Sequence, residues 1–140
     1  RLQRLTSGPL IDALPGSWEL WLDGGHNAAA GETLAAVAAD WAEAPLHLVF
    51  GMLDSKEPAA FLRPLVARIE ALHAIAIPGE DASLSADAAA TAAKNLGIVA
   101  APAEDVGAAI ATISANATAH GRILICGSLY LVGQVLADNA

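Results

Sequence analysis

Three short segments of the chain combine polar side chains with glycine directly after a run of apolar residues. The first reads Asp23-Gly24-Gly25-His26-Asn27 and precedes an Ala-rich stretch typical of a helix. Since backbone N–H groups at a helix N-terminus attract anions, this junction is suited to bind a phosphate. Asp23 could hold a magnesium ion, a water or a ribose hydroxyl, and His26 could contact a phosphate or orient a neighbouring residue. In the structural alternative, Asp23 only braces the turn and Asn27 only caps the helix.

The second segment, residues 51–56, ends in a lysine at the expected start of a helix. The helix dipole disfavours a cation at that place, which indicates a carboxylate or phosphate partner for Lys56. The alternative is a solvated lysine that pairs with Asp54 or Glu57.

The third segment places Ser128 two residues after Cys126, at the start of the last expected helix. Ser128 is either a simple N-cap or a hydroxyl that contacts a ligand. Cys126 closes a strongly apolar strand, and nothing nearby would lower the pKa of its thiol, so we expect a core residue. Three further candidates for metal ligands, His47, His73 and His120, show no metal-ligand spacing with one another.

Five units of strand followed by helix must position these segments. Composition and periodicity predict strands at 18–22, 46–50, 73–77, 98–100 and 122–126. Helices are predicted at 28–41, 61–72 with a break at Pro64, 85–95, 106–113 and 129–136, the last marked by Leu129, Val132, Val135 and Leu136. This alternation predicts an α/β fold with a mostly parallel sheet of about six strands and helices on both faces. The sixth strand is residues 1–5, at an edge and free to run antiparallel. Ligands bind such sheets at the carboxyl ends of the strands, where all three segments lie.

Composition excludes several classes of protein. With a net charge of −8 and 4% aromatic residues, the chain is a poor candidate for binding nucleic acid. No apolar run approaches the roughly 18 residues of a membrane span, and no secretory signal opens the chain. The single cysteine excludes an internal disulfide and a Cys-rich zinc site, which favours a cytoplasmic protein.

Residues 1–140 are expected to form a single domain cut from a longer protein, because the chain begins at Arg1 and its only methionine is Met52. The chain contains no P-loop, no dinucleotide-binding glycine motif and no nucleophile elbow. Junctions suited to anions without a complete catalytic set indicate one half of a two-domain site.

Four segments in order resemble a known set of motifs. Residues 23–27 are similar to D-G-A-H-N-P, and residues 1–3 to the end of P-G-R-[LF]-[EQ]. Residues 49–57 are similar to G-x-L-x-D-K-D, and residues 123–133 to a segment containing [TC]-G-S-[LF]-[YH]-x-[VA]-[GA]. Together they resemble the C-terminal domain of folylpolyglutamate synthases and dihydrofolate synthases, in the Mur ligase superfamily. Gly25, Ala28 and Glu57 depart from the usual Ala, Pro and Asp, and none of these changes disables the site.

The resemblance implies an ATP-dependent ligase that joins L-glutamate to folate or dihydropteroate through an acyl phosphate, with magnesium as cofactor. It implies that Arg1, Asp23 and Asn27 contact the nucleotide and that His26 lies near the transferred phosphate. Lys56 and Ser128 would hold the carboxylates of the incoming glutamate. An N-terminal P-loop domain would carry most magnesium ligands, so the isolated domain is expected to be inactive and to hold no metal of its own.

Two other functions remain open from the sequence. One is a Mur-type ligase domain that acts on a peptidoglycan precursor. The other is a stand-alone α/β module that binds a ligand without catalysis.

Overall fold

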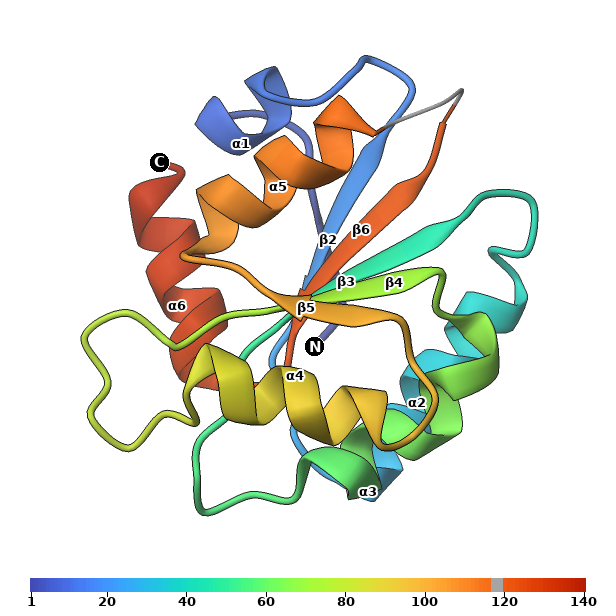
Figure 1. The fold of residues 1–140 in the computed structure, drawn as a ribbon. Helices are drawn as coiled ribbons and strands as arrows, with labels where there is room; N and C mark the ends of the chain where they lie inside the picture. Colours follow the sequence, from blue (N-terminus) through green and yellow to red (C-terminus); the bar gives the residue numbers. More distant parts are fainter. Residues whose placement is uncertain (117–119) are drawn as a thin grey trace.

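The structure is a computed structural model that describes residues 1–116 and 120–140. A six-stranded sheet forms the centre of this part of the chain (Figure 1). The strands run in the order β1-β2-β6-β3-β4-β5. Their bounds are β1 Gln3–Leu5, β2 Glu19–Asp23, β3 Leu46–Phe50, β4 Ala71–Ala74, β5 Ala100–Pro102 and β6 Arg122–Cys126. β1 is antiparallel to β2, whereas every other neighbouring pair is parallel. The predicted mostly parallel sheet with an edge strand near the N-terminus is therefore confirmed.

Helices cover both faces of this sheet, as predicted (Figure 1). One face packs against α2, α3, the 3₁₀ helix η1 and α4, and the other against α1, α5 and α6. Their bounds are α1 Pro9–Asp12, α2 Ala28–Ala39, α3 Pro58–Leu62, η1 Arg63–Arg68, α4 Ala86–Lys94, α5 Val106–Ala115 and α6 Leu129–Asp138. The break predicted at Pro64 is confirmed, because the α-helix ends at Leu62 and a 3₁₀ helix continues.

Two strands lie at shifted positions. The fourth strand occupies Ala71–Ala74 instead of 73–77, and the fifth occupies Ala100–Pro102 instead of 98–100. Ile75 and Ile77 follow the end of β4: the N–H of Ile75 still donates to the carbonyl of Phe50 in β3, whereas that of Ile77 donates to Oγ of Ser83. Both side chains are buried beneath the helices. β5 lies at an edge of the sheet, where a proline costs no ladder hydrogen bond. The short helix α1 was not predicted.

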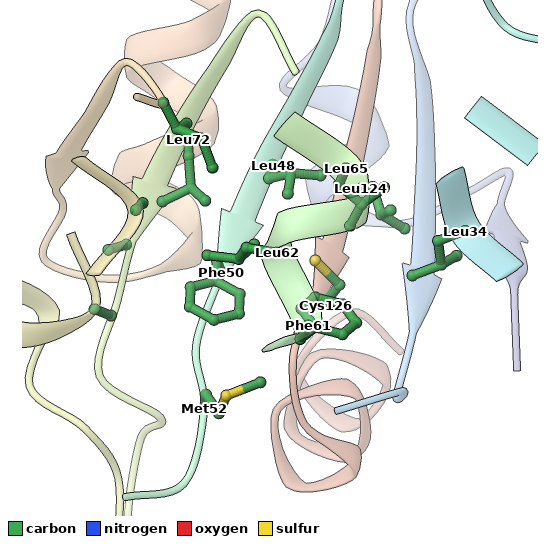
Figure 2. Close-up of a cluster of buried hydrophobic side chains, with 14 of the residues drawn as sticks. Leu34, Leu48, Phe50, Met52, Phe61, Leu62, Leu65, Leu72, Leu124 and Cys126 are labelled. Atoms are coloured by element: carbon green, nitrogen blue, oxygen red, sulfur yellow. The ribbon is translucent and has the colours of Figure 1, made fainter. Parts of the chain in front are cut away.

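The core on the α2 side consists of side chains from β3, β4 and β6 that meet α2, α3, η1 and α4 (Figure 2). The rings of Phe50 and Phe61 stack with centroids 6.0 Å apart. β6 is buried on both faces, since Ile123 and Ile125 face one cluster while Leu124 and Cys126 face the other. The continuous apolar sequence of this strand follows from its central place in a parallel sheet.

The amino ends of β2 and β6 are joined by an ionic cluster. Nε of Arg122 lies 3.0 Å from Oε1 of Glu19, and Nη2 lies 2.6 Å from Oε1 of Glu43. Burial alone would raise the pKa of Glu19, but hydrogen bonds from Trp21 and Arg122 lower that pKa below its ordinary value. The cluster fixes the two strands at the end of the sheet opposite to the strand-to-helix junctions.

Two half-buried histidines predict an acid-sensitive fold. Burial lowers the pKa of His47 and of His73, and the charge of a protonated His73 lowers the pKa of His47 further, although Glu70 opposes this effect. The unfolded chain takes up these protons near pH 6.5 while the folded chain resists them, so stability is complete above that pH and falls below it. We expect urea denaturation to give a lower free energy of unfolding at pH 5.5 than at pH 7.5. His47→Gln should make this difference smaller, and an unchanged difference would contradict the assignment.

A matched pair of glycine substitutions tests the packing of α2 on α3. A Cβ at Gly31 would collide with the carbonyl oxygen of Phe61, which is backbone and cannot rotate away. Gly31→Ala should therefore destabilise the fold by roughly 1 to 3 kcal/mol. Gly133, in α6, has open space around it, so Gly133→Ala should raise stability by up to about 1 kcal/mol. Thermal unfolding of both variants measures the contrast, and two equal effects would refute the close contact.

Candidate functional site

The order of the strands brings the three polar segments together. β6 lies between β2 and β3, and Cys126 is in register with both Asp23 and Phe50. The three strands therefore end at the same level, and the segments that follow them meet there. Two contacts join these segments: the side chain of Leu129 lies against Gly24, and the backbone of Gly127 lies against Gly51.

The turn after β2 is built by the side chains predicted for it. Asp23 is 7% exposed, and its Oδ2 accepts a hydrogen bond of 2.8 Å from the N–H of Gly25. Its Oδ1 lies 3.6 Å from the backbone nitrogen of Arg1, whose side chain is exposed. Oδ1 of Asn27 accepts the N–H of Ala30 at 2.9 Å and caps α2. Both structural roles considered for Asp23 and Asn27 are present, and one oxygen of Asp23 remains outside the turn.

A cleft of about 260 Å³ brings together three of the predicted site residues, His26, Lys56 and Ser128. They come from the segments after β2, β3 and β6, respectively. Nδ1 of His26 lies 3.4 Å from the carbonyl oxygen of Gly24. Arg1, Asp23 and Asn27 do not line this cleft but belong to the adjoining turn and the N-terminus. The cleft therefore combines a lysine, an imidazole and a hydroxyl, a set suited to anionic ligands.

The sequence predicts Lys56 at the start of a helix, whereas in the structure Lys56 lies before the helix. The helix that follows, α3, has 5 residues and begins at Pro58, so Lys56 precedes it and a helix dipole gives no reason for its placement. The N–H of Lys56 donates to the carbonyl of Leu53 at 3.1 Å, which closes a turn. Among the ion pairs of the described residues, none joins Lys56 to Asp54 or Glu57. Its ammonium group is exposed and available to a ligand.

Ser128 is held by its role as a helix cap. The side chain is 3% exposed, and its Oγ accepts the N–H of Tyr130 at 3.1 Å at the start of α6. The preceding Gly127 has φ +110, and a Cβ there would collide with the carbonyl oxygen of Gly51. Only glycine allows the chain to turn this tightly, and the turn presents Ser128 to the cleft. The N-cap interpretation is confirmed, and the cap also fixes the hydroxyl beside Lys56.

Sequence reasoning named none of the other residues that line the cleft as site residues, which are Leu53, Gly127, Leu129 and Tyr130. The apolar face of the last helix was assigned through Leu129 and Leu136, but these are 64% and 37% exposed, whereas Leu131 is buried. Tyr130 is 61% exposed beside Leu129. A signal was present, because the continuous apolar run at the start of this helix is longer than one buried stripe needs.

Neither a metal cluster nor a membrane span is found in the described residues. Within 1–116 and 120–140, no three His, Cys, Asp or Glu side chains gather in a group that could hold a metal ion. In the same ranges, no helix has the length and apolar character to cross a membrane.

The fold and the cleft define a Rossmann-like α/β domain whose candidate ligand site lies at the carboxyl ends of parallel strands. The profile of the family described as dihydrofolate synthetase, C-terminal domain, matches residues 12–138. The chain belongs to this family, since the match spans most of its 140 residues. The resemblance seen in the sequence is confirmed, and nothing found favours the Mur-type alternative or the stand-alone module. No curated protein matches the chain in a sequence comparison.

Solved structures share the fold. The bifunctional folylpolyglutamate synthase/dihydrofolate synthase of Yersinia pestis, complexed with AMPPNP and Mn ion, is 26% identical and has a TM-score of 0.73. A bifunctional enzyme of the same name with Mn, AMPPNP and L-glutamate bound is 24% identical, with a TM-score of 0.77. FolC of E. coli in complex with DHPP and ADP is 23% identical, with a TM-score of 0.74. Each match covers 96% of this chain and 30% of the other, so this chain spans about a third of their length.

The buried thiol of Cys126 gives a prediction at this site. The residue is 0% exposed at the end of β6, and burial, with a smaller effect of the Asp23 charge, raises the pKa of the thiol. A buried neutral thiol is a poor nucleophile. We expect iodoacetamide to leave Cys126 unmodified in the native chain and to label it in denaturant, as measured by intact mass. Stoichiometric labelling of the native chain would show that the end of β6 opens.

Proposed function

We propose that this chain is the C-terminal domain of a two-domain, ATP-dependent amide ligase that adds L-glutamate to folate, to dihydropteroate or to both. One observation carries the proposal: His26, Lys56 and Ser128 converge on one cleft, in a chain of the dihydrofolate synthetase family. Relatives of the same fold were solved with ADP, AMPPNP, DHPP, L-glutamate and Mn, which supports this substrate set.

We assign the nucleotide to Arg1, Asp23 and Asn27. Asp23 keeps Oδ1 outside the turn that Oδ2 braces, so it can accept a hydrogen bond from a ribose hydroxyl. The Arg1 side chain is exposed and suited to clamp phosphates with its planar guanidinium. Asn27 fixes the first turn of α2, whose N–H groups favour a nearby anion.

Magnesium is the divalent ion we propose for this ligase, where it would neutralise charge on the phosphates of ATP. Asp23 is a carboxylate at the nucleotide side of the site, and an oxygen ligand of this kind suits magnesium. The described residues hold no cluster of three potential metal ligands, so we place most magnesium ligands in the N-terminal domain.

The amide bond forms in two steps. The terminal phosphoryl group of ATP moves to a carboxylate of the folate or dihydropteroate substrate, which gives an acyl phosphate and ADP. The amine of glutamate then attacks the acyl carbon, and inorganic phosphate leaves. His26 lies in the cleft where it can contact the transferred phosphate, while Lys56 and Ser128 bind carboxylates of glutamate and so orient its amine.

The remaining machinery belongs to a second domain. This chain spans 30% of the length of the solved relatives, and it contains no P-loop. We propose that an N-terminal P-loop domain carries the phosphate cradle and most of the folate pocket and that the reaction occurs between the two domains. The isolated chain would then be inactive, and the full enzyme would work in the cytoplasm.

Substitution of Lys56 in the full-length protein tests this function. We expect glutamate-dependent release of ADP with dihydropteroate or folate as acceptor. Lys56→Ala should raise the KM for glutamate roughly tenfold, because a charge-assisted contact to its carboxylate is lost, and should change the KM for ATP little.

Lys94→Ala is the matched control, since Lys94 is exposed at the end of α4 and does not line the cleft. It should leave both constants unchanged. An effect of Lys56→Ala on ATP alone would refute the carboxylate assignment. A wild-type enzyme that releases no ADP in response to glutamate would refute the ligase function itself.

A further inference from the structure

A second cleft, of about 730 Å³, lies between the start of α3 and the end of α4. Figure 1 shows these two helices side by side on the same face of the sheet. Lys56 lines both this outer cleft and the cleft that holds His26 and Ser128. The side chain of Lys56 therefore lies at the boundary of the cleft that holds His26 and Ser128, called here the inner cleft, and of the outer one, within reach of a ligand in either.

The outer cleft carries a second cation, Arg63, which the function proposed above does not use. Arg63 is exposed, and none of the ion pairs among the described residues involves it or Lys56. By contrast, Arg122 at the other end of the sheet is bound by Glu19 and Glu43. Glu57 also lines the outer cleft, so its charged side chains are two cations and one carboxylate. In a chain of net charge −8, two cations without an ion-pair partner still favour an anion there.

The rest of the outer cleft suits the carbon chain of a small amino acid. Ala59 and Ala92 supply apolar wall, Leu96 adds a larger apolar surface, and Asn95 contributes an amide. Glutamate consists of two carboxylates joined by a short apolar chain. In the placement inferred here, the amine and the α-carboxylate lie in the inner cleft beside Lys56 and Ser128, and the side chain extends past Lys56 towards the outer cleft.

We propose that Arg63 binds the side-chain carboxylate of the incoming glutamate and thereby selects glutamate over its neutral isostere glutamine. The inference rests on the ligase function proposed above and adds a specificity residue to it. A guanidinium recognises a carboxylate through paired N–H groups and gains much less from a neutral amide. Arg63 is thus a substrate-binding residue that lies outside the cleft where the bond forms.

Competition between the two amino acids in the full-length enzyme tests this inference. The measured quantities are the KM for glutamate and the inhibition constant of glutamine against glutamate-dependent ADP release. Arg63→Gln should reduce the ratio of the glutamine constant to the glutamate KM roughly fivefold to tenfold, mainly by raising the glutamate KM. Arg63→Lys, which keeps the charge but not the paired N–H groups, should restore part of the ratio.

Arg68→Gln is the matched control, because Arg68 is an exposed arginine of the same 3₁₀ helix and lies outside the outer cleft. It should leave the ratio at its wild-type value. An unchanged ratio in Arg63→Gln, or an equal weakening of both amino acids, would overturn the inference while an active wild-type enzyme keeps the ligase function intact. An inactive wild-type enzyme would instead overturn the function on which the inference rests.

Discussion

The close approach of Gly127 to the carbonyl of Gly51 is the constraint on which the candidate site depends. β6 is buried on both faces, so its end cannot shift without disturbing both cores. At that end the chain turns with a positive φ and packs directly on the segment after β3. The packing of Leu129 on Gly24 adds the segment after β2. Three loops are thereby held at one level, two by a backbone contact and the third by a side chain, and their polar side chains meet as a consequence.

The polar side chains of the site fall into two groups, those that hold the backbone of a turn or helix start and those that are available to a ligand. Asp23, Asn27 and Ser128 each accept a backbone N–H and so hold the turn or helix start that carries them. Lys56 is exposed and forms no ion pair with any described residue. Side chains that already accept backbone hydrogen bonds fix the geometry of the turns before a ligand binds, which lowers the entropic cost of orienting substrates. The ammonium group of Lys56 then supplies a positive charge at a defined place.

In two places where a prediction from the sequence was wrong, contacts between distant segments had outweighed the local structural preference of the residues. Ile77 has strand-like composition, but it lies beyond the end of β4, where its N–H bonds Oγ of Ser83, and it is buried by helices. The apolar start of the last helix was assigned to the core, yet Leu129 packs across the loops and remains 64% exposed. In a third place, Lys56 was expected at a helix start, but α3 begins at Pro58 and the N–H of Lys56 closes a turn with Leu53 instead.

The sequence by itself determined the α/β class, the two-sided core, the strand-to-helix junctions and the family motifs, because hydrophobic periodicity and glycine positions are local properties. It also identified His26, Lys56 and Ser128 as candidates. Only the tertiary structure decided that β6 lies between β2 and β3, and therefore that these three residues share one cleft. The same is true of Arg63, which the packing of α3 on α4 places beside Lys56 in the outer cleft. Strand order and helix packing depend on contacts between segments far apart in the chain, which no local pattern records.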